Sequence, residues 1–163
     1  MRHSPILFLL LVLVFVSGCA RSLPPYEKPI ARTQHQFVRT TAYTHSERDH
    51  RCYGNRSALG TPLRYDTIHS AAADWARWPA GTLFRIQETG EVCQVDDYGW
   101  ALAGTNTIDL YKPGFCEMRA WGVKRVHIQI LDWGNPWESY RRLKPVRNYR
   151  HIKRMMWEIK KFY

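Results

Sequence analysis

The sequence of 163 residues lacks the motifs that define several common protein classes. It contains no Cys-x2-Cys pair, and His45, His50 and His69 have no recognised ligand spacing, so we expect neither a bound metal nor a cofactor. It also contains no nucleic-acid-binding motif, no internal repeat and no low-complexity tract. The longest apolar run, residues 5–16, is shorter than the about 20 residues that a membrane-spanning helix needs. Zinc modules, nucleic-acid-binding modules and single-span membrane proteins are therefore not expected.

The first 18 residues resemble the signal peptide of a bacterial lipoprotein. Arg2 and His3 precede the apolar run, and Val16-Ser17-Gly18-Cys19 resembles a lipobox. Such a signal is removed before the cysteine, and an acylated Cys19 then anchors the protein to a membrane surface. An ordinary signal peptide with an incidental cysteine is the alternative. No Asp follows Cys19, as in lipoproteins sorted to the outer membrane, so we expect a lipid-anchored protein of the cell envelope that faces the periplasm.

Removal of residues 1–18 leaves enough chain for one domain with a real core. Residues 19–36 contain Pro24, Pro25 and Pro29 among polar neighbours, which is typical of a tether between a lipid anchor and a domain. We therefore expect the folded domain to begin near Phe37.

Three cysteines remain after Cys19, and their number is odd. In an oxidising compartment, Cys52, Cys93 and Cys116 predict one disulfide and one free thiol. We expect the bridge between Cys93 and Cys116, because these two lie on either side of the same aspartate-containing stretch.

Basic residues are concentrated at the C-terminus. The chain has 24 Lys and Arg residues against 14 Asp and Glu, and residues 135–163 alone contain nine basic and two acidic residues. This tail either packs on the domain with a solvated basic face or binds an anionic envelope polymer or lipid headgroups.

The same segment, residues 135–163, predicts a basic amphipathic helical tail. Asn135-Pro136-Trp137-Glu138 supplies an N-cap, a proline at the first helical position and a Glu three residues after the cap. Pro145 interrupts this helix. Beyond it, apolar residues recur at three- and four-residue steps, at Tyr149, Ile152, Met156, Ile159 and Tyr163.

Residues 37–134 predict short β-strands separated by turns. Helical periodicity is scarce in this region, and Val123 to Leu131 alternates clearly. Strands of this number and spacing favour an all-β fold, either a small closed barrel or a sandwich. The expected strands are residues 37–44, 67–73, 82–87, 91–95, 107–111 and 123–131.

Three aspartates lie at or near these strands. Asp74 follows one predicted strand, Asp97 ends another before a glycine-containing turn, and Asp109 lies within a third. Separate strands can bring such carboxylates to one face of a barrel, and Gly99 and Gly104 allow backbone or substrate to approach closely. Ordinary turn chemistry is the alternative, because Asp and Gly are common in turns.

An ordered series of short motifs resembles the 3D (three-aspartate) domain family. The resemblance covers residues 37–134 and implies a six-stranded double-psi β-barrel. The motifs are Thr41-Ala42-Tyr43, Gly60-Thr61, Ala73-Asp74, Pro79-x-Gly81-Thr82, Asp97-x-Gly99, Gly104, Ile108-Asp109-Leu110-Tyr111 and Trp121-Gly122.

The 3D family includes the catalytic barrel of MltA-type lytic transglycosylases. The resemblance therefore implies cleavage of the MurNAc–GlcNAc bond in peptidoglycan glycan strands, with 1,6-anhydro-MurNAc ends as product. Its three aspartates correspond to Asp74, Asp97 and Asp109, which the resemblance implies are the catalytic residues, with Asp109 in the acid/base position. Asp96 has no family counterpart and is interpreted as a charged neighbour.

We expect substrate contacts from residues that flank these aspartates, since aromatic rings stack well on sugar faces. The sequence departs from the family at Asp97-Tyr98-Gly99-Trp100, where Asp-Thr-Gly-Gly is frequent, and at Asp74-Trp75, where Asp-Pro is frequent. These departures affect the shape of the cleft and its sugar preference. The expected substrate-binding residues are Tyr43, Thr61, Tyr98, Gly99, Trp100 and Gly104.

Two other functions remain open. A related barrel can bind glycan without turnover, because a fold does not fix an activity. Alternatively, Asp97 and Asp109 can act as an inverting pair around a water molecule, which would make the protein a polysaccharide hydrolase. The mass of the product separates the two enzymes, since an anhydro product is one water lighter.

Overall fold

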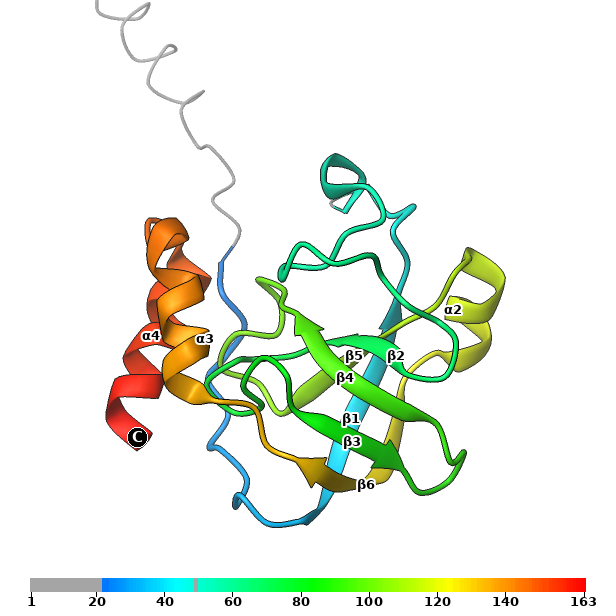
Figure 1. Cartoon of the computed structure of the whole chain (residues 1–163), viewed down its shortest axis with the longest axis horizontal. Helices are drawn as coiled ribbons and strands as arrows, with labels where there is room; N and C mark the ends of the chain where they lie inside the picture. Colours follow the sequence, from blue (N-terminus) through cyan, green and yellow to red (C-terminus); the bar gives the residue numbers. More distant parts are fainter. Residues whose placement is uncertain (1–21, 49) are drawn as a thin grey trace, which may run out of the picture.

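A computed structural model describes residues 22–48 and 50–163, so the expected signal peptide and Cys19 lie outside the described residues. The strands close into one six-stranded barrel, in the order β1-β5-β2-β4-β3-β6. Figure 1 shows how the labelled strands are arranged around it. Each strand begins and ends within two residues of its expected range. The closed strand order confirms the barrel rather than the sandwich. The strands are β1 (His35–Tyr43), β2 (His69–Ala72), β3 (Leu83–Ile86), β4 (Val92–Asp97), β5 (Thr107–Tyr111) and β6 (Lys124–Asp132).

The strand pairing is mixed. The β1–β5 and β2–β4 pairs are parallel, whereas the other four pairs are antiparallel. The antiparallel β1–β6 pair joins the first strand to the last and closes the barrel. Along β1 and β6 exposed and buried residues alternate over most of the strand, as expected when one face of a strand packs on a core.

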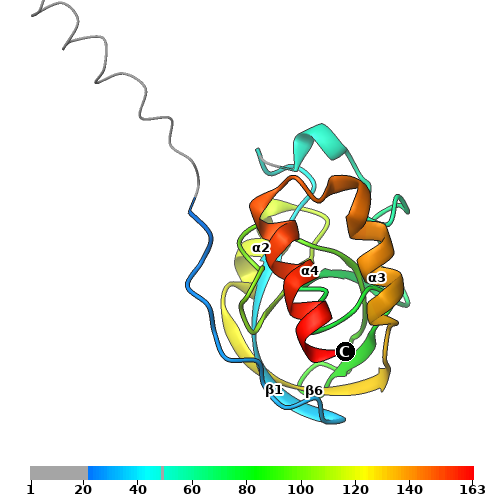
Figure 2. The ribbon, with the colours of Figure 1, turned by 90° about the vertical axis from the view of Figure 1, so that its left-hand side faces the viewer.

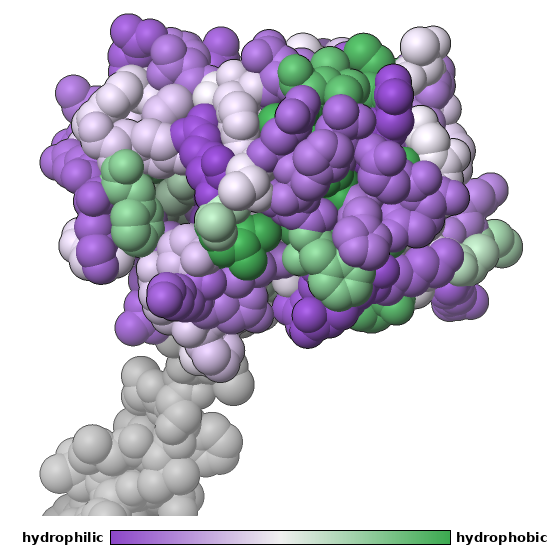
Figure 3. Space-filling view, turned by 90° about the horizontal axis from the view of Figure 1, so that it is seen from below, coloured by the Kyte–Doolittle hydropathy of each residue, from purple (hydrophilic) through white to green (hydrophobic). Residues whose placement is uncertain are grey.

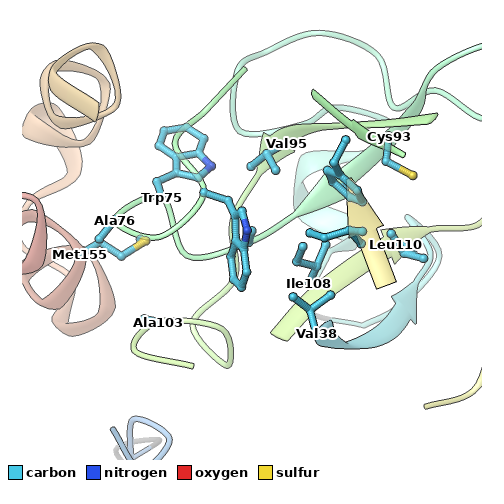
Figure 4. Close-up of a cluster of buried hydrophobic side chains, with 14 of the residues drawn as sticks. Val38, Trp75, Ala76, Cys93, Val95, Ala103, Ile108, Leu110 and Met155 are labelled. Atoms are coloured by element: carbon cyan, nitrogen blue, oxygen red, sulfur yellow. The ribbon is translucent and has the colours of Figure 1, made fainter. Parts of the chain in front are cut away.

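The barrel core continues into the C-terminal helix. Val38, Val95, Ile108 and Leu110 point into the barrel, and Trp75 borders them (Figure 4). On the other side of Trp75 the core reaches helix α4 (Arg150–Phe162), where Met155 lies beside Ala76 (Figure 4). Barrel and helix therefore share one continuous core.

Three α-helices and two short 3-10 turns complete the described chain. Helix α2 was not expected, because its seven residues are too few to give a periodic signal. Figure 2 shows α3 and α4 side by side over one side of the barrel. The elements are η2 (Arg51–Tyr53), α2 (Phe115–Trp121), α3 (Pro136–Leu143), η3 (Lys144–Val146) and α4 (Arg150–Phe162).

The start of α3 is the one that the sequence predicts. The side chain of Asn135 accepts hydrogen bonds from the backbone N–H groups of Trp137 and Glu138, and Pro136 occupies the first turn. Pro145 lies in η3 and separates the two helices.

Helix α4 buries the predicted Ile152, Met156 and Ile159 together with Met155. Tyr149 and Tyr163, which the periodicity placed on the same apolar face, are exposed instead.

The segment before β1 is packed against the domain. The backbone N–H of Glu27 donates to the carbonyl of Gly104 at 2.8 Å, and the Glu27 carboxylate accepts from the N–H of Asn106 at 2.6 Å. Arg154 of α4 donates to the carbonyl of Pro24 at 2.7 Å. The expected tether therefore does not extend to residue 36: from Pro24 onward the chain is bound to the domain, and β1 already begins at His35.

The expected disulfide between Cys93 and Cys116 is wrong. Cys93 is buried in the core on β4, and Cys116 is exposed on α2; both thiols are free. Burial raises the pKa of the Cys93 thiol to about 12, so this group is an inert core residue.

The outside of the domain is mainly polar. Seen from below, the surface is largely hydrophilic and carries separate groups of hydrophobic side chains (Figure 3). None of the helices in residues 22–48 and 50–163 combines the length and apolar character needed to cross a bilayer.

Candidate active site

The strand register places two of the predicted aspartates on either side of one alanine. Ala72, at the end of β2, is the Cα partner of Asp97 on β4 and of Asp109 on β5. On the far side of β5, Asp109 is the partner of Thr41 on β1. Neighbouring strands lie about 4.8 Å apart, so two strand spacings separate the Cα atoms of the aspartates by roughly 10 Å. Because Ala72 has only a methyl side chain, β2 does not fill the space between the carboxylates.

A cleft of about 760 Å³ opens onto this row of residues. Its walls come from the segment after β1, the β4–β5 connection and the start of α4, which gather on the upper side of the barrel in Figure 1. The volume falls within the range of ligand sites, roughly 300–1,000 Å³. The lining residues are Tyr43, Glu47, His50, Tyr53, Arg56, Ser57, Ala58, Gly60, Ala72, Asp97, Tyr98, Gly99, Trp100, Ala101, Leu102, Asp109 and His151.

Asp97 is held through both of its carboxylate oxygens. Oδ1 accepts hydrogen bonds from the backbone N–H groups of Ala58 at 3.1 Å and Tyr98 at 2.9 Å, and Oδ2 accepts from the Tyr43 hydroxyl at 3.2 Å. Burial raises the pKa of Asp97, although these hydrogen bonds and the nearby His50 act in the opposite direction. Asp97 is thus a fixed carboxyl group with a pKa above its usual value.

Asp109 is the more exposed of the two carboxylates. Its Oδ1 accepts a hydrogen bond from the Thr41 hydroxyl at 2.7 Å. Thr41 is β-branched and therefore restricted at χ1, so this bond orients the Asp109 carboxylate from the neighbouring strand. The pKa of Tyr43 is raised well above its usual value, chiefly by burial and also by the negative charges of Asp97 and Asp109. The Tyr43 phenol consequently keeps the proton that it donates to Asp97.

Asp74 does not reach the cleft. Its side chain is fully buried, and its two oxygens accept hydrogen bonds from the backbone N–H groups of Ala76 and Gly104. Burial raises the pKa of Asp74. The catalytic role that the resemblance implied for Asp74 is not supported by this placement, because its carboxylate ties the turn after β2 to the β4–β5 connection.

Gly104 is a structural residue of the same connection. It has a φ of 78°, and a Cβ at this position would lie 2.9 Å from atoms of the Arg154 side chain. Only glycine fits this conformation and this contact without strain. Gly104 lies outside the cleft lining, so the expected substrate contact is not formed here.

Asp96 is a buried neighbour of the site. Its Oδ2 accepts hydrogen bonds from the Ser70 hydroxyl at 2.6 Å and from Arg64 at 3.3 Å, and its Oδ1 has no hydrogen-bond partner among the described residues. Burial raises the pKa of Asp96, and the charge of Asp97 acts in the same direction. Asp96 does not line the cleft, which agrees with its interpretation as a charged neighbour.

Most of the predicted substrate-binding residues do line the cleft. Thr61 does not, but its hydroxyl bonds with that of Ser57 at 3.0 Å, and Ser57 lines the cleft. Thr61 therefore supports the wall rather than forming it. The residues in the lining are Tyr43, Tyr98, Gly99 and Trp100.

Two histidines that the sequence did not indicate as site residues, His50 and His151, line the cleft. His50 precedes η2, and its Nε2 atom is buried without a hydrogen-bond partner in the described part of the chain. His151 lies in the first turn of α4, with its ring centroid 6.0 Å from that of Tyr98. Burial lowers the pKa of His151, which favours its neutral form. No local spacing marks either residue, because the fold of distant segments brings them together.

The other histidines considered as metal ligands have different partners. His45 Nδ1 lies 2.8 Å from the Tyr111 hydroxyl, and His69 Nδ1 lies 3.7 Å from a Glu91 carboxylate oxygen. Within residues 22–48 and 50–163, no group of three or more His, Cys, Asp or Glu residues is arranged to hold a metal ion.

Three of the motifs behind the family resemblance lie at the cleft. Thr41-Ala42-Tyr43 and Ile108-Asp109-Leu110-Tyr111 lie side by side in the β1–β5 pair, and Asp97-x-Gly99 borders the same cleft. The departures at Tyr98 and Trp100 add two aromatic side chains to its wall. No protein-family model matches the sequence, and no curated protein is significantly similar to it.

Proposed function

We propose that this protein is a peptidoglycan lytic transglycosylase with Asp109 as its acid/base. One observation carries the proposal: Asp109 and Asp97 flank Ala72 at the floor of a cleft with aromatic walls. Cleavage of a glycosidic bond needs a proton for the leaving oxygen and negative charge near an oxocarbenium-like centre. The carboxyl groups of Asp109 and Asp97 can supply the proton and the negative charge.

The strand path supports a double-psi barrel of the 3D type. Both parallel pairs, β1–β5 and β2–β4, join strands that are not consecutive in the sequence. Such pairs require the chain to cross over between them, as an interlocked double-psi path does. With the resemblance over residues 37–134, this pairing makes the 3D-type barrel our proposed fold family.

The two carboxylates have different surroundings and therefore different proposed roles. Asp109 is the more exposed, and the Thr41 hydroxyl orients it, so we assign it the proton transfers. Asp97 has both oxygens occupied by Ala58, Tyr98 and Tyr43, so we assign it the positioning of the substrate and the electrostatic stabilisation of the positive transition state.

The proposed reaction uses one acid/base group twice. Protonated Asp109 donates its proton to the oxygen that leaves with GlcNAc as the glycosidic bond breaks. The resulting Asp109 carboxylate removes the proton from the C6 hydroxyl of MurNAc, and O6 bonds to C1 to close the 1,6-anhydro ring. No water attacks, so a second general base is unnecessary. Tyr98 and Trp100 line the cleft where their rings can stack on sugar faces.

We also propose that the protein is a lipoprotein of the cell envelope. The lipobox-like Val16-Ser17-Gly18-Cys19 carries this proposal, with Cys19 as the acylated residue. A lipid anchor would hold the cleft near the glycan strands.

The test is digestion of purified peptidoglycan with the protein and with its Asp109→Asn variant. Soluble products are then identified by mass. Asp132→Asn is the matched control, because Asp132 is an exposed aspartate at the end of β6 outside the cleft. Anhydro-muropeptides from the wild type and the control, but not from Asp109→Asn, are the expected result.

Other products would overturn the proposal. Reducing-end products, one water heavier, would indicate a hydrolase that uses Asp97 and Asp109 around water. Co-sedimentation of both forms with peptidoglycan, without any release, would indicate a binding protein. Equal release by the wild type and Asp109→Asn would refute the assignment of Asp109.

A further inference from the structure

Helices α3 and α4 and the connection between them form a strongly basic surface. Glu158 is fully buried, and Glu138 pairs with Arg141 and Arg142, so acidic side chains offset little of this charge. Arg154 turns inward to the carbonyls of Pro24 and Ala103. We call the exposed cations of this region the basic face: Arg141, Arg142, Lys144, Arg147, Arg150, Lys153, Lys160 and Lys161.

Large aromatic side chains are exposed among these cations. The Trp157 side chain on α4 is 55 % exposed, and Tyr149 just before α4 is 60 % exposed. Lys161 Nζ lies 4.8 Å from the centroid of the Trp157 ring. Covering exposed rings of this size with another apolar surface is favourable, by about 25 cal/mol per Å² of apolar area removed from water. The aromatic members are Trp137, Tyr149, Trp157, Phe162 and Tyr163.

The basic face lies beside the point where the N-terminal segment joins the domain. Arg154 bonds to the carbonyl of Pro24, and Figure 2 shows this segment running past α4. Five peptide units separate Cys19 from Pro24 and span at most about 18 Å. If Cys19 carries the proposed lipid, Pro24 lies within about 18 Å of the lipid-bearing residue, and the Arg154 side chain of α4 bonds to Pro24.

From these observations we propose that the basic face binds an anionic lipid surface. Lys and Arg side chains attract the headgroups, while Trp157, Tyr149 and Trp137 enter the boundary between headgroups and acyl chains. This inference goes beyond the proposed enzymatic function. Binding through α3 and α4 would fix how the cleft is held relative to the membrane, because His151 of α4 is part of the cleft wall.

The aromatic side chains favour a lipid surface over a soluble anionic polymer. A flexible polyanion needs positive charge but offers no apolar layer for indole rings. A bilayer interface offers both, and Trp and Tyr are suited to it because one part of each ring system is apolar and another forms hydrogen bonds.

The experiment is co-sedimentation with vesicles, using the chain from Ser22 to Tyr163, which contains every contact described here and lacks the signal peptide and Cys19. The vesicles consist of phosphatidylcholine alone or mixed with phosphatidylglycerol. One variant combines Lys153→Gln, Lys160→Gln and Lys161→Gln. Its matched control combines Arg85→Gln, Arg119→Gln and Arg125→Gln, which remove three exposed cations from other surfaces.

We expect the wild type and the control to bind the phosphatidylglycerol vesicles. The lysine variant should bind roughly 100-fold more weakly, since each basic residue near such a surface strengthens binding about fivefold. Trp157→Ala should also weaken binding, and its unchanged thermal unfolding would show that the fold is intact. Absence of vesicle binding, equal loss in both triple variants, or binding of poly-glutamate in place of vesicles would overturn the proposal.

Discussion

The buried Glu158 should make the stability of this protein fall as the pH rises toward neutrality. Glu158 lies on α4, and its carboxylate has no hydrogen-bond partner among the described residues. Its nearest cation is Arg77, whose Nε lies 3.6 Å from Oε2. Arg77 is shared with the equally buried Asp74 at 3.9 Å, and Arg154 adds a further positive charge. Two negative charges, on Asp74 and Glu158, would therefore be less stable beside Arg77 than one.

The magnitude follows from the pKa of Glu158. Burial, with the charge of Asp74, raises it from 4.5 to about 7, although Arg77 and Arg154 act in the opposite direction. Between pH 4.5 and 7 the folded state binds the proton and the unfolded state does not. The stability that protonated Glu158 contributes is therefore fully present below pH 4.5 and is lost as the pH rises through 7. The free energy of unfolding falls by about 3 kcal/mol because of this group.

Urea unfolding between pH 4 and pH 8, followed by tryptophan fluorescence, measures this effect. Glu158→Gln removes the titration, so its free energy of unfolding should rise relative to the wild type by about 3 kcal/mol across this range. Glu117→Gln, at an exposed glutamate on α2, is the control and should follow the wild-type profile. Parallel pH profiles for the wild type and Glu158→Gln would refute the reasoning.

Three further changes test the site and the packing. Thr41→Val removes the hydrogen bond to Asp109 and should lower kcat roughly 10-fold to 100-fold in the peptidoglycan assay. Thr41→Ser keeps the hydroxyl and should restore activity. Equal rates for the wild type and Thr41→Val would contradict the positioning role of Thr41. Met155→Ala removes a buried side chain from the core that the barrel shares with α4, and should lower the free energy of unfolding by about 3 kcal/mol. A urea midpoint unchanged from the wild type would contradict the shared core. Asn135→Ala removes the N-cap of α3 and should lower the free energy of unfolding by about 1 kcal/mol in the same urea assay. Asn135→Asp should retain most of the stability. Equal losses in the two variants would contradict the capping role of Asn135.

Local sequence patterns were sufficient to predict the strands and the start of α3. Alternation and β-prone residues predict the six strands, and the Asn135 cap is a short-range signal that the structure confirms. These patterns did not predict which strands pair. In the barrel β2 lies between β4 and β5, and neither of these follows β2 directly in the chain. The common partner of Asp97 and Asp109, Ala72, could therefore be recognised only in the folded barrel.

The parts of the site that sequence reasoning missed depend on distant segments. His151 enters the cleft because α4 packs on the barrel through Met155 and Ile159, a contact between segments with no shared motif. Asp74 lies just after β2, as Asp97 lies at the end of β4, but the backbone N–H of Gly104 in the β4–β5 connection donates a hydrogen bond to the buried Asp74 carboxylate. A position at a strand end therefore did not distinguish a cleft residue from a buried cap.

The pairing of β1 with β6 has a consequence for the order in which the protein can fold. His35 to Thr40 pair with Lys124 to Gln129, so the barrel cannot close until nearly the whole domain has been synthesised. Contacts between such distant residues slow folding, because the loop between them must be ordered first. A chain that stays unfolded until its last strand emerges also leaves its strand edges exposed to wrong pairing for the same period.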